Sequence, residues 1–199
     1  AATTRDLPLT NPAVPRTVAV STDAELSNAI GAALPGDVIE LAAGTYDGPI
    51  TIDASGTLSN PIIVRGEAAD AVTIDAAGGT YGVTIWGSHV YLEDVTVSGS
   101  TWGARSYNTD GIVIQRSRFI NVERGIYAKS GSNYNFYICD NVLEGKHAWP
   151  NISSSTWNDE GITVSGQGHT VCHNTLSGFG DALGLANSTA IMNLAIDFY

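Results

Sequence analysis

Hydrophobic residues in this chain recur in a repeated six-residue pattern that begins and ends with an apolar residue. Its five copies are LEDVTV (92–97), IQRSRF (114–119), ICDNVL (138–143), VCHNTL (171–176) and IMNLAI (191–196). Their starts are 22, 24, 33 and 20 residues apart. A strand-like pattern with a period of about 20–25 residues predicts a solenoid, in which each coil packs only against its neighbours.

A second phrase keeps the same period and begins with glycine. It reads GVTI from Gly82, GARS from Gly103, GIYA from Gly125 and GITV from Gly161, with a weaker copy, ALGL, from Ala182. Apolar residues alternate within it, as in strands whose successive side chains point to opposite faces. We therefore predict an all-β protein built as a single right-handed parallel β-helix. A β-sandwich would not keep residue types in register over five units, and the Leu/Asn consensus of a leucine-rich repeat is absent.

The N-terminal part has the pattern of a short helix. Thr22, followed three residues later by Glu25, is a capping-box pattern, and apolar residues with helical spacing follow it. We expect an extended segment over 1–20, followed by a β-helix domain over 21–199. A helix over 22–34 should cap its open N-terminal end. No polar capping segment follows the last coil, so we expect further coils or a second chain to cover that end.

One coil carries an insertion over 146–160, which lengthens the glycine spacing from 21 or 22 residues to 36. The insertion contains Trp149 and Trp157. Loops on repeat proteins often collect where ligands bind, so these two tryptophans are candidate ligand contacts. The alternative is a passive surface loop.

Rows of outward side chains follow from the register of the glycine phrases. The residue before each repeat glycine, and the residues two and four after it, should face outward and stack from coil to coil about 4.8 Å apart. The rows are Tyr81, Trp102, Arg124, Glu160, Asp181; then Thr84, Arg105, Tyr127, Thr163, Gly184; then Trp86, Tyr107, Lys129, Ser165, Ala186. We call these three rows the outward strip.

The chemistry of the outward strip suits a sugar chain. Aromatic faces stack on sugar rings, and Arg and Lys pair with carboxylates or sulfates. The predicted partner is therefore an anionic polysaccharide. Its expected contacts are Trp102, Tyr107, Tyr127, Trp149 and Trp157.

Charge narrows the partners further. The net charge is −11 and the isoelectric point is near 4.5, which argues against nucleic acid as a partner. Six of the nine basic residues nevertheless fall between 105 and 146, as a local basic island or as ordinary surface scatter. No apolar run reaches 18 residues, so no membrane span is predicted. The polar, proline-bearing start is typical of a mature terminus after cleavage, which favours a secreted or cell-surface protein.

The two cysteines, Cys139 and Cys172, occupy the same place in consecutive six-residue patterns. They should therefore lie on adjacent coils. A disulfide would suit a secreted protein. The alternative is a stacked pair of free thiols, because directly opposed residues on parallel strands rarely have good disulfide geometry.

The opening PGDVIEL (35–41), with GTY (44–46), NPI (60–62) and RG (65–66), adds a family resemblance. Together with the coils, it resembles secreted β-helix polysaccharide lyases of the chondroitinase B and alginate lyase type, over roughly residues 20–145. That family has a Lys-Ser pair whose lysine is the catalytic base, preceded by an acidic calcium ligand. Lys129-Ser130 matches the pair and Glu123 corresponds approximately to the acid. The family's Arg-His-Gly is replaced here by Val164-Ser165-Gly166.

A lyase reading assigns roles to the charged residues. β-Elimination removes the proton next to a uronate carboxylate, so it needs a base and a cation that neutralises the carboxylate. Lys129 is the predicted base, with a pKa lowered by the like charges of Arg105 and Arg124. Either arginine could pair with the carboxylate. A Ca²⁺ ion is a candidate cofactor, with Glu123 and Asp159 as its ligands.

Two other functions stay open. A glycoside hydrolase would use Glu160 and Asp181 as paired carboxylates on adjacent coils, about 5 Å apart, which suits retention of configuration. A binding or structural β-helix at a cell surface would need aromatic and amide groups but no perturbed titratable group.

Overall fold

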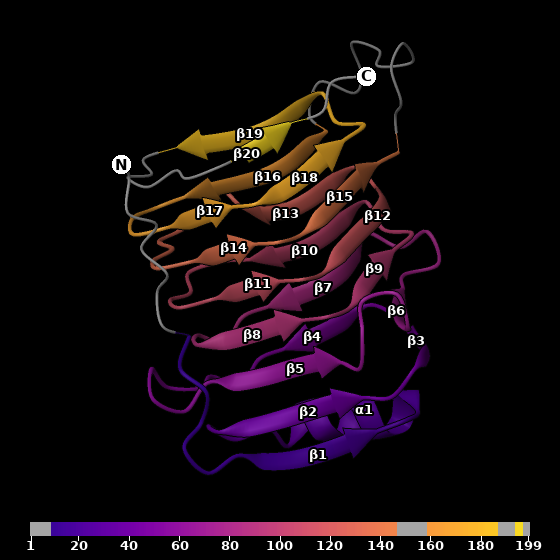
Figure 1. The fold of residues 1–199 in the computed structure, drawn as a ribbon, viewed down its shortest axis with the longest axis vertical. Helices are drawn as coiled ribbons and strands as arrows, with labels where there is room; N and C mark the ends of the chain where they lie inside the picture. The colour runs from indigo at the N-terminus through magenta and orange to yellow at the C-terminus, as the bar shows by residue number, and fades with distance from the viewer. Residues whose placement is uncertain (1–8, 147–158, 187–193, 197–199) are drawn as a thin grey trace.

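The chain forms a parallel β-solenoid of about seven turns with one short helix (Figure 1). The structure is a computed structural model that describes residues 9–146, 159–186 and 194–196. Every pairing between its described strands is parallel, from β1 against β2 to β18 against β20. The predicted class, an all-β parallel solenoid, is therefore confirmed.

Each complete coil contributes one strand to each of three sheets. The first sheet, in spatial order, contains β1 (Arg16–Val20), β2 (Asp37–Leu41), β5 (Ile62–Gly66), β8 (Val90–Glu93), β11 (Val113–Gln115), β14 (Tyr137–Cys139) and β17 (Thr170–Cys172). The second contains β3 (Gly44–Asp47), β6 (Val72–Asp75), β9 (Thr96–Ser98), β12 (Arg118–Val122), β15 (Val142–Gly145), β18 (Asn174–Ser177) and β20 (Leu194–Ile196). The third contains β4 (Ile50–Ile52), β7 (Tyr81–Ile85), β10 (Trp102–Ser106), β13 (Arg124–Ala128), β16 (Glu160–Ser165) and β19 (Asp181–Ala186).

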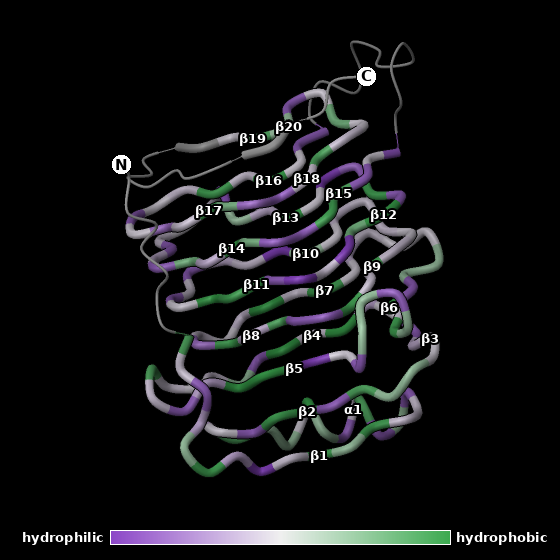
Figure 2. Tube along the Cα trace, in the orientation of Figure 1, coloured by the Kyte–Doolittle hydropathy of each residue, from purple (hydrophilic) through white to green (hydrophobic). Residues whose placement is uncertain are grey.

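The core is built from aliphatic residues that repeat coil after coil. Val83, Ile126 and Ile162, from the glycine phrases of three coils, are almost wholly buried in one continuous cluster. Colouring by hydropathy shows apolar segments recurring along the stack (Figure 2). The hydrophobic free energy of the fold therefore comes from contacts between successive coils.

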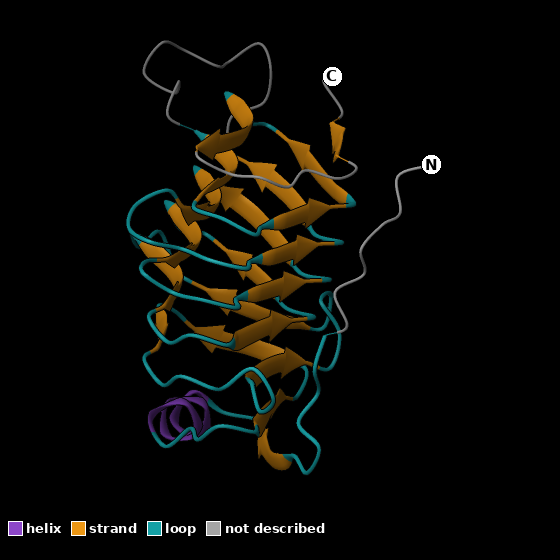
Figure 3. Cartoon of the chain, turned by 90° about the vertical axis from the view of Figure 1, so that its left-hand side faces the viewer, coloured by secondary structure: helices purple, strands orange, loops and turns teal. Residues whose placement is uncertain are grey.

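The helix α1 (Asp23–Gly31) lies at the N-terminal end of the stack (Figure 3). Thr22 is its N-cap and accepts a hydrogen bond from the backbone N–H of Glu25, while Leu26 and Ile30 are buried. The helix ends three residues before the predicted boundary, where the chain turns into Pro35-Gly36. No helix in the described ranges is long and apolar enough to cross a membrane.

The N-terminal segment contributes to the solenoid. Residues 16–20 form β1, which pairs along its whole length with β2. Leu9 packs on an apolar stripe on the outer side of the first sheet, made by Val38, Ile63, Tyr91 and Val113. The first sheet therefore begins inside the segment expected to be extended.

The repeat glycines are explained by crowding inside the coil. A Cβ at Gly103 would lie 2.6 Å from the carbonyl oxygen of Gly125 and 2.7 Å from the ring of Phe119. A Cβ at Gly125 would lie 2.5 Å from the carbonyl oxygen of Gly161. At this point of each coil, both the glycine and the side chain of the residue after it face the core. The residues one before and two after the glycine consequently face the same, outer side.

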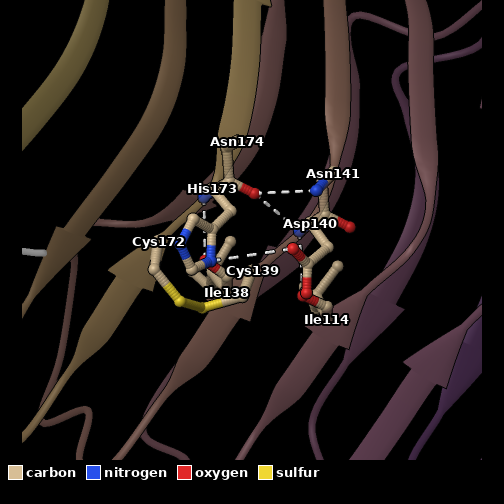
Figure 4. Close-up of a disulfide and its surroundings, with 8 residues drawn as sticks. All are labelled: Ile114, Ile138, Cys139, Asp140, Asn141, Cys172, His173 and Asn174. Carbon is tan, nitrogen blue, oxygen red and sulfur yellow. Dashed lines mark hydrogen bonds and ion pairs between the residues drawn. A yellow bond between two sulfur atoms is a disulfide. The ribbon is translucent and has the colours of Figure 1, made fainter. Parts of the chain in front are cut away.

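Cys139 and Cys172 form a disulfide between β14 and β17 (Figure 4). They pair directly in the strand register, with a Cα–Cα distance of 4.6 Å, inside the range of about 4.4–6.8 Å that disulfides require. The alternative of two free thiols is therefore wrong. Beside the disulfide, the Asn141 side chain donates to Asn174 Oδ1 at 2.9 Å in a buried amide ladder.

Candidate functional site

The outward strip lies along the third sheet in the predicted register. Trp102 pairs with Tyr81 on one side and Arg124 on the other, and Arg105 pairs with Tyr127. Farther along, Glu160 pairs with Asp181. Since these strands are hydrogen-bonded neighbours, side chains far apart in the sequence form continuous rows.

A groove opens in the aromatic half of the strip. Its volume is about 340 Å³, within the roughly 300–1,000 Å³ typical of ligand pockets. It is lined by Trp86, Trp102, Arg105, Ser106, Tyr107, Tyr127 and Ser130. Because these residues come from β10, β13 and the turns that follow β7, β10 and β13, the groove runs along the solenoid axis across three coils.

Arg105 is held in the groove by aromatic rings. Its guanidinium carbon lies 4.2 Å from the ring centre of Tyr81 and 4.9 Å from that of Trp86. The Trp102 ring is 5.9 Å away. Cation–π contacts of this kind orient a guanidinium and leave its N–H edge able to bind a carboxylate in a forked geometry.

Arg105 also differs from the other cations in its partners. Nine Lys and Arg residues occur in the sequence, and eight of them lie in the described ranges. Seven of these eight form ion pairs with carboxylates: Arg16, Arg65, Arg116, Arg118, Arg124, Lys129 and Lys146. Within those ranges, Arg105 is the one without a carboxylate partner. It is thus the cation that remains available to an anionic ligand.

The basic island predicted from the sequence does not form one surface. Arg116 binds Asp94 beside the first sheet, and Arg118 faces Glu144 on the second. Lys146 pairs with Glu123 at 3.5 Å. Consecutive strands of a coil belong to different sheets, so residues close in sequence are dispersed around the solenoid.

Glu160 joins the two cations beside the groove. Its carboxylate accepts a hydrogen bond from Lys129 at 3.0 Å and lies 3.7 Å from Arg124 Nε. The Glu160 side chain is only 11% exposed, whereas that of Lys129 is 48% exposed. The pair therefore sits at the surface but its carboxylate is largely enclosed.

The pKa prediction for Lys129 is wrong in direction. The hydrogen bond and negative charge of Glu160 raise the pKa of Lys129, and they outweigh the opposing charge of Arg124. Lys129 is therefore protonated near neutral pH and, in this arrangement, is not a free base.

Glu160 and Asp181, the predicted hydrolase pair, are adjacent as expected from the register, but they differ in exposure and in their partners. Both oxygens of Glu160 face cations, whereas Asp181 is exposed. The buried Asp159 precedes them, and its backbone carbonyl accepts a hydrogen bond from Asp181.

The predicted calcium ligands do not assemble into a site in the described part of the chain. Glu123 is engaged with Lys146, and no group of three His, Cys, Asp or Glu residues in the described ranges could hold a metal ion. Trp149 and Trp157 lie outside the described residues.

Two residues that contact Arg105 were not among the predicted site residues. Tyr81 and Trp86 hold the Arg105 guanidinium, although both belonged to the predicted rows. The sequence signal that could have identified them is an aromatic neighbour in the same row. The Tyr81 ring contacts Trp102 of the next coil edge to face, and the Trp86 ring contacts Tyr107 in the same way.

Comparisons with known proteins identify the fold. No protein-family model matches the chain, and no curated protein matches it. A solved alginate lyase from Paenibacillus sp. str. FPU-7 is similar at a TM-score of 0.61 and 20% identity, over 87% of this chain and 75% of that one. Pectate lyase Pel9A is similar at a TM-score of 0.50 and 17% identity, over 82% of this chain and 55% of the lyase. The resemblance to β-helix lyases therefore holds for the fold, and the chain spans about half of Pel9A.

Proposed function

We propose that this protein is a polysaccharide lyase that cleaves a uronate-containing polysaccharide bound along the outward strip. The observation that carries the proposal is Arg105, a cation without a carboxylate partner in the described ranges, held by three aromatic rings in an open groove. Its guanidinium suits a sugar carboxylate, and the rings beside it suit sugar faces. The two solved lyases of similar fold support the same class.

The reaction assigned to this site is β-elimination. A base removes the proton from the carbon bearing the carboxylate, the bond from the neighbouring carbon to the glycosidic oxygen breaks, and a proton is delivered to that oxygen. The products are an unsaturated uronate and a new chain end. Negative charge grows on the carboxylate as the proton leaves, and Arg105 would stabilise it there.

The proton-transfer roles follow from the Lys129 pairing. Because Glu160 keeps Lys129 protonated, Lys129 suits the donor to the leaving oxygen better than the base. Tyr107 is an exposed residue on the groove wall, and its side-chain oxygen is the candidate acceptor for the proton. Tyr107→Phe keeps the ring and removes this group, so it should lower kcat far more than it raises KM.

The deciding experiment is an assay on a panel of uronate polymers that follows the ultraviolet absorbance of the unsaturated product. Arg105→Ala should lower kcat/KM by about 100-fold, since it removes a charge-assisted bidentate contact. Arg118→Ala, which removes an arginine from the second sheet, is the matched control and should leave the rate unchanged. Full activity of Arg105→Ala would refute the assignment.

The same assay separates the other functions. New reducing ends without absorbance would point to hydrolysis by Glu160 and Asp181, which are paired in register. Binding without cleavage would point to a carbohydrate-binding surface protein. Calcium stays a prediction from the family resemblance, and parallel reactions with CaCl₂ and with a chelator test it.

A secreted or cell-surface location belongs to the proposal. The Cys139–Cys172 disulfide supports it, because such bonds persist in oxidising compartments. Localisation of the protein in fractionated source cells would test this directly.

A further inference from the structure

Charge is distributed unevenly along the outward strip. β7 and the residue after it supply only uncharged side chains, Tyr81, Thr84 and Trp86. β10 supplies Arg105, and β13 supplies Arg124 and, just beyond it, Lys129. β16 and β19 add Glu160 and Asp181. A polysaccharide lying along the strip therefore meets an uncharged coil, then two basic coils, then two acidic coils, spaced about 4.8 Å apart.

The two cations after Arg105 are already occupied. Glu160 binds both Lys129 and Arg124 through its two carboxylate oxygens and is largely enclosed in doing so. In effect, a carboxylate of the protein takes the place that a second carboxylate of the ligand would need. A chain acidic at every sugar would leave its next carboxylate facing Glu160 and Asp181.

We infer that Glu160 determines specificity, by restricting the strip to polysaccharides in which an acidic sugar is flanked by uncharged sugars. This inference rests on the proposed function and deepens it. Arg105 takes the single carboxylate, and the rings of Trp86, Trp102 and Tyr127 take neutral sugar faces. A polymer charged at every sugar is disfavoured, because the Glu160 carboxylate beside Arg124 and Lys129 repels the carboxylates of the ligand.

The test compares two acidic oligosaccharides of equal length. In one, every sugar is a uronate; in the other, uronates alternate with neutral sugars. Binding is read from the initial change in tryptophan fluorescence after rapid mixing, before turnover, because Trp86 and Trp102 line the groove. The natural protein should prefer the alternating chain by about tenfold, the scale of one charge-assisted hydrogen bond.

Glu160→Gln should bind the fully acidic chain about tenfold more tightly and leave the alternating chain nearly unchanged, since it releases Lys129 and Arg124. Glu144→Gln is the matched control. It makes the same chemical change and releases Arg118, but on the second sheet, so the preference should not move. Equal shifts for both ligands in Glu160→Gln would overturn the inference and leave the proposed function intact.

Two further measurements keep the outcomes distinct. Arg105→Ala should lose both ligands, and if the natural protein bound neither acidic chain, the proposed function itself would fall. The second measurement is the salt dependence of binding by the natural protein, which tests the number of open cations without a Glu160 variant. With Arg105 as the one cation of the described residues that has no carboxylate partner, log affinity should fall with log salt at a slope of about one. A slope near three would show that Arg124 and Lys129 also bind the ligand.

Discussion

At the scale of single residues, the cations differ in what holds them: most are paired with carboxylates, whereas Arg105 is held by aromatic rings. An ion pair orients a cation but neutralises it, whereas an aromatic cage orients it and leaves its charge for a ligand. Arg105 and Arg124 illustrate the contrast, because both contact Trp102 but only Arg124 also faces Glu160. The functional difference between two neighbouring arginines therefore lies in their partners.

Asp37 is a residue whose charge supports the fold. It is buried, binds Arg16 Nε at 2.6 Å and accepts the Leu34 N–H at 2.7 Å. The hydrogen bond from Arg16 lowers the pKa of Asp37. A lowered pKa gives stability that is present above the unfolded value of about 3.9 and lost as pH falls through the folded value.

Asp37→Asn should therefore lower the free energy of unfolding by about 1.5–3 kcal/mol at neutral pH and by less in acid. Urea unfolding of both proteins from neutral pH downward measures this. A difference that stayed constant over the whole range would show that the Asp37 charge is not the cause.

At the scale of elements, successive coils approach closely at one crowded position, where glycine recurs. Ala in place of Gly125 would put a Cβ 2.3 Å from Leu143 and 2.5 Å from a carbonyl of the next coil. The leucine side chain could move, but the carbonyl belongs to a hydrogen-bonded strand and could not.

Gly125→Ala should cost about 1–3 kcal/mol of unfolding free energy, measured by urea or thermal unfolding. The control is Gly31→Ala at the end of α1, where nothing lies within 4 Å of the added carbon. That change should be neutral or slightly stabilising, since alanine favours a helix. Similar losses in both variants would contradict the crowding explanation.

The rows of the strip could be predicted because register is a property of the backbone. Tyr127 follows Arg105 in its row whatever their side chains do. The ion-pair partners could not be predicted, because they depend on side-chain conformation. The register predicts Glu160 one coil from Arg124, but not that Glu160 also reaches Lys129 and raises its pKa. Whether Cys139 and Cys172 bond also depends on side-chain conformation, so the sequence leaves both alternatives open. The capping role of α1 stays a prediction.

At the scale of the whole molecule, the disulfide joins two coils separated by 33 residues of chain. Closing a loop of this length restricts the unfolded chain and should stabilise the fold by about 2–4 kcal/mol. The bond joins β14 and β17 of the first sheet, and the insertion over 146–160 lies between them in the sequence.

Replacing Cys139 and Cys172 together by Ser should remove that stabilisation. Urea unfolding with and without a reductant measures it: reductant should weaken the natural protein to the level of the variant and leave the variant unchanged. A natural protein indifferent to complete reduction would contradict this role.

The position of the disulfide also bears on how the protein could change over evolution. It closes the one coil that carries the insertion, between β15 and the strand that begins with Glu160. The entropic cost of a flexible loop grows slowly, by about 0.6 kcal/mol for each doubling of its length. The number of residues between Lys146 and Glu160 can therefore change over evolution while the disulfide-linked coils hold their register, without redesign of the core.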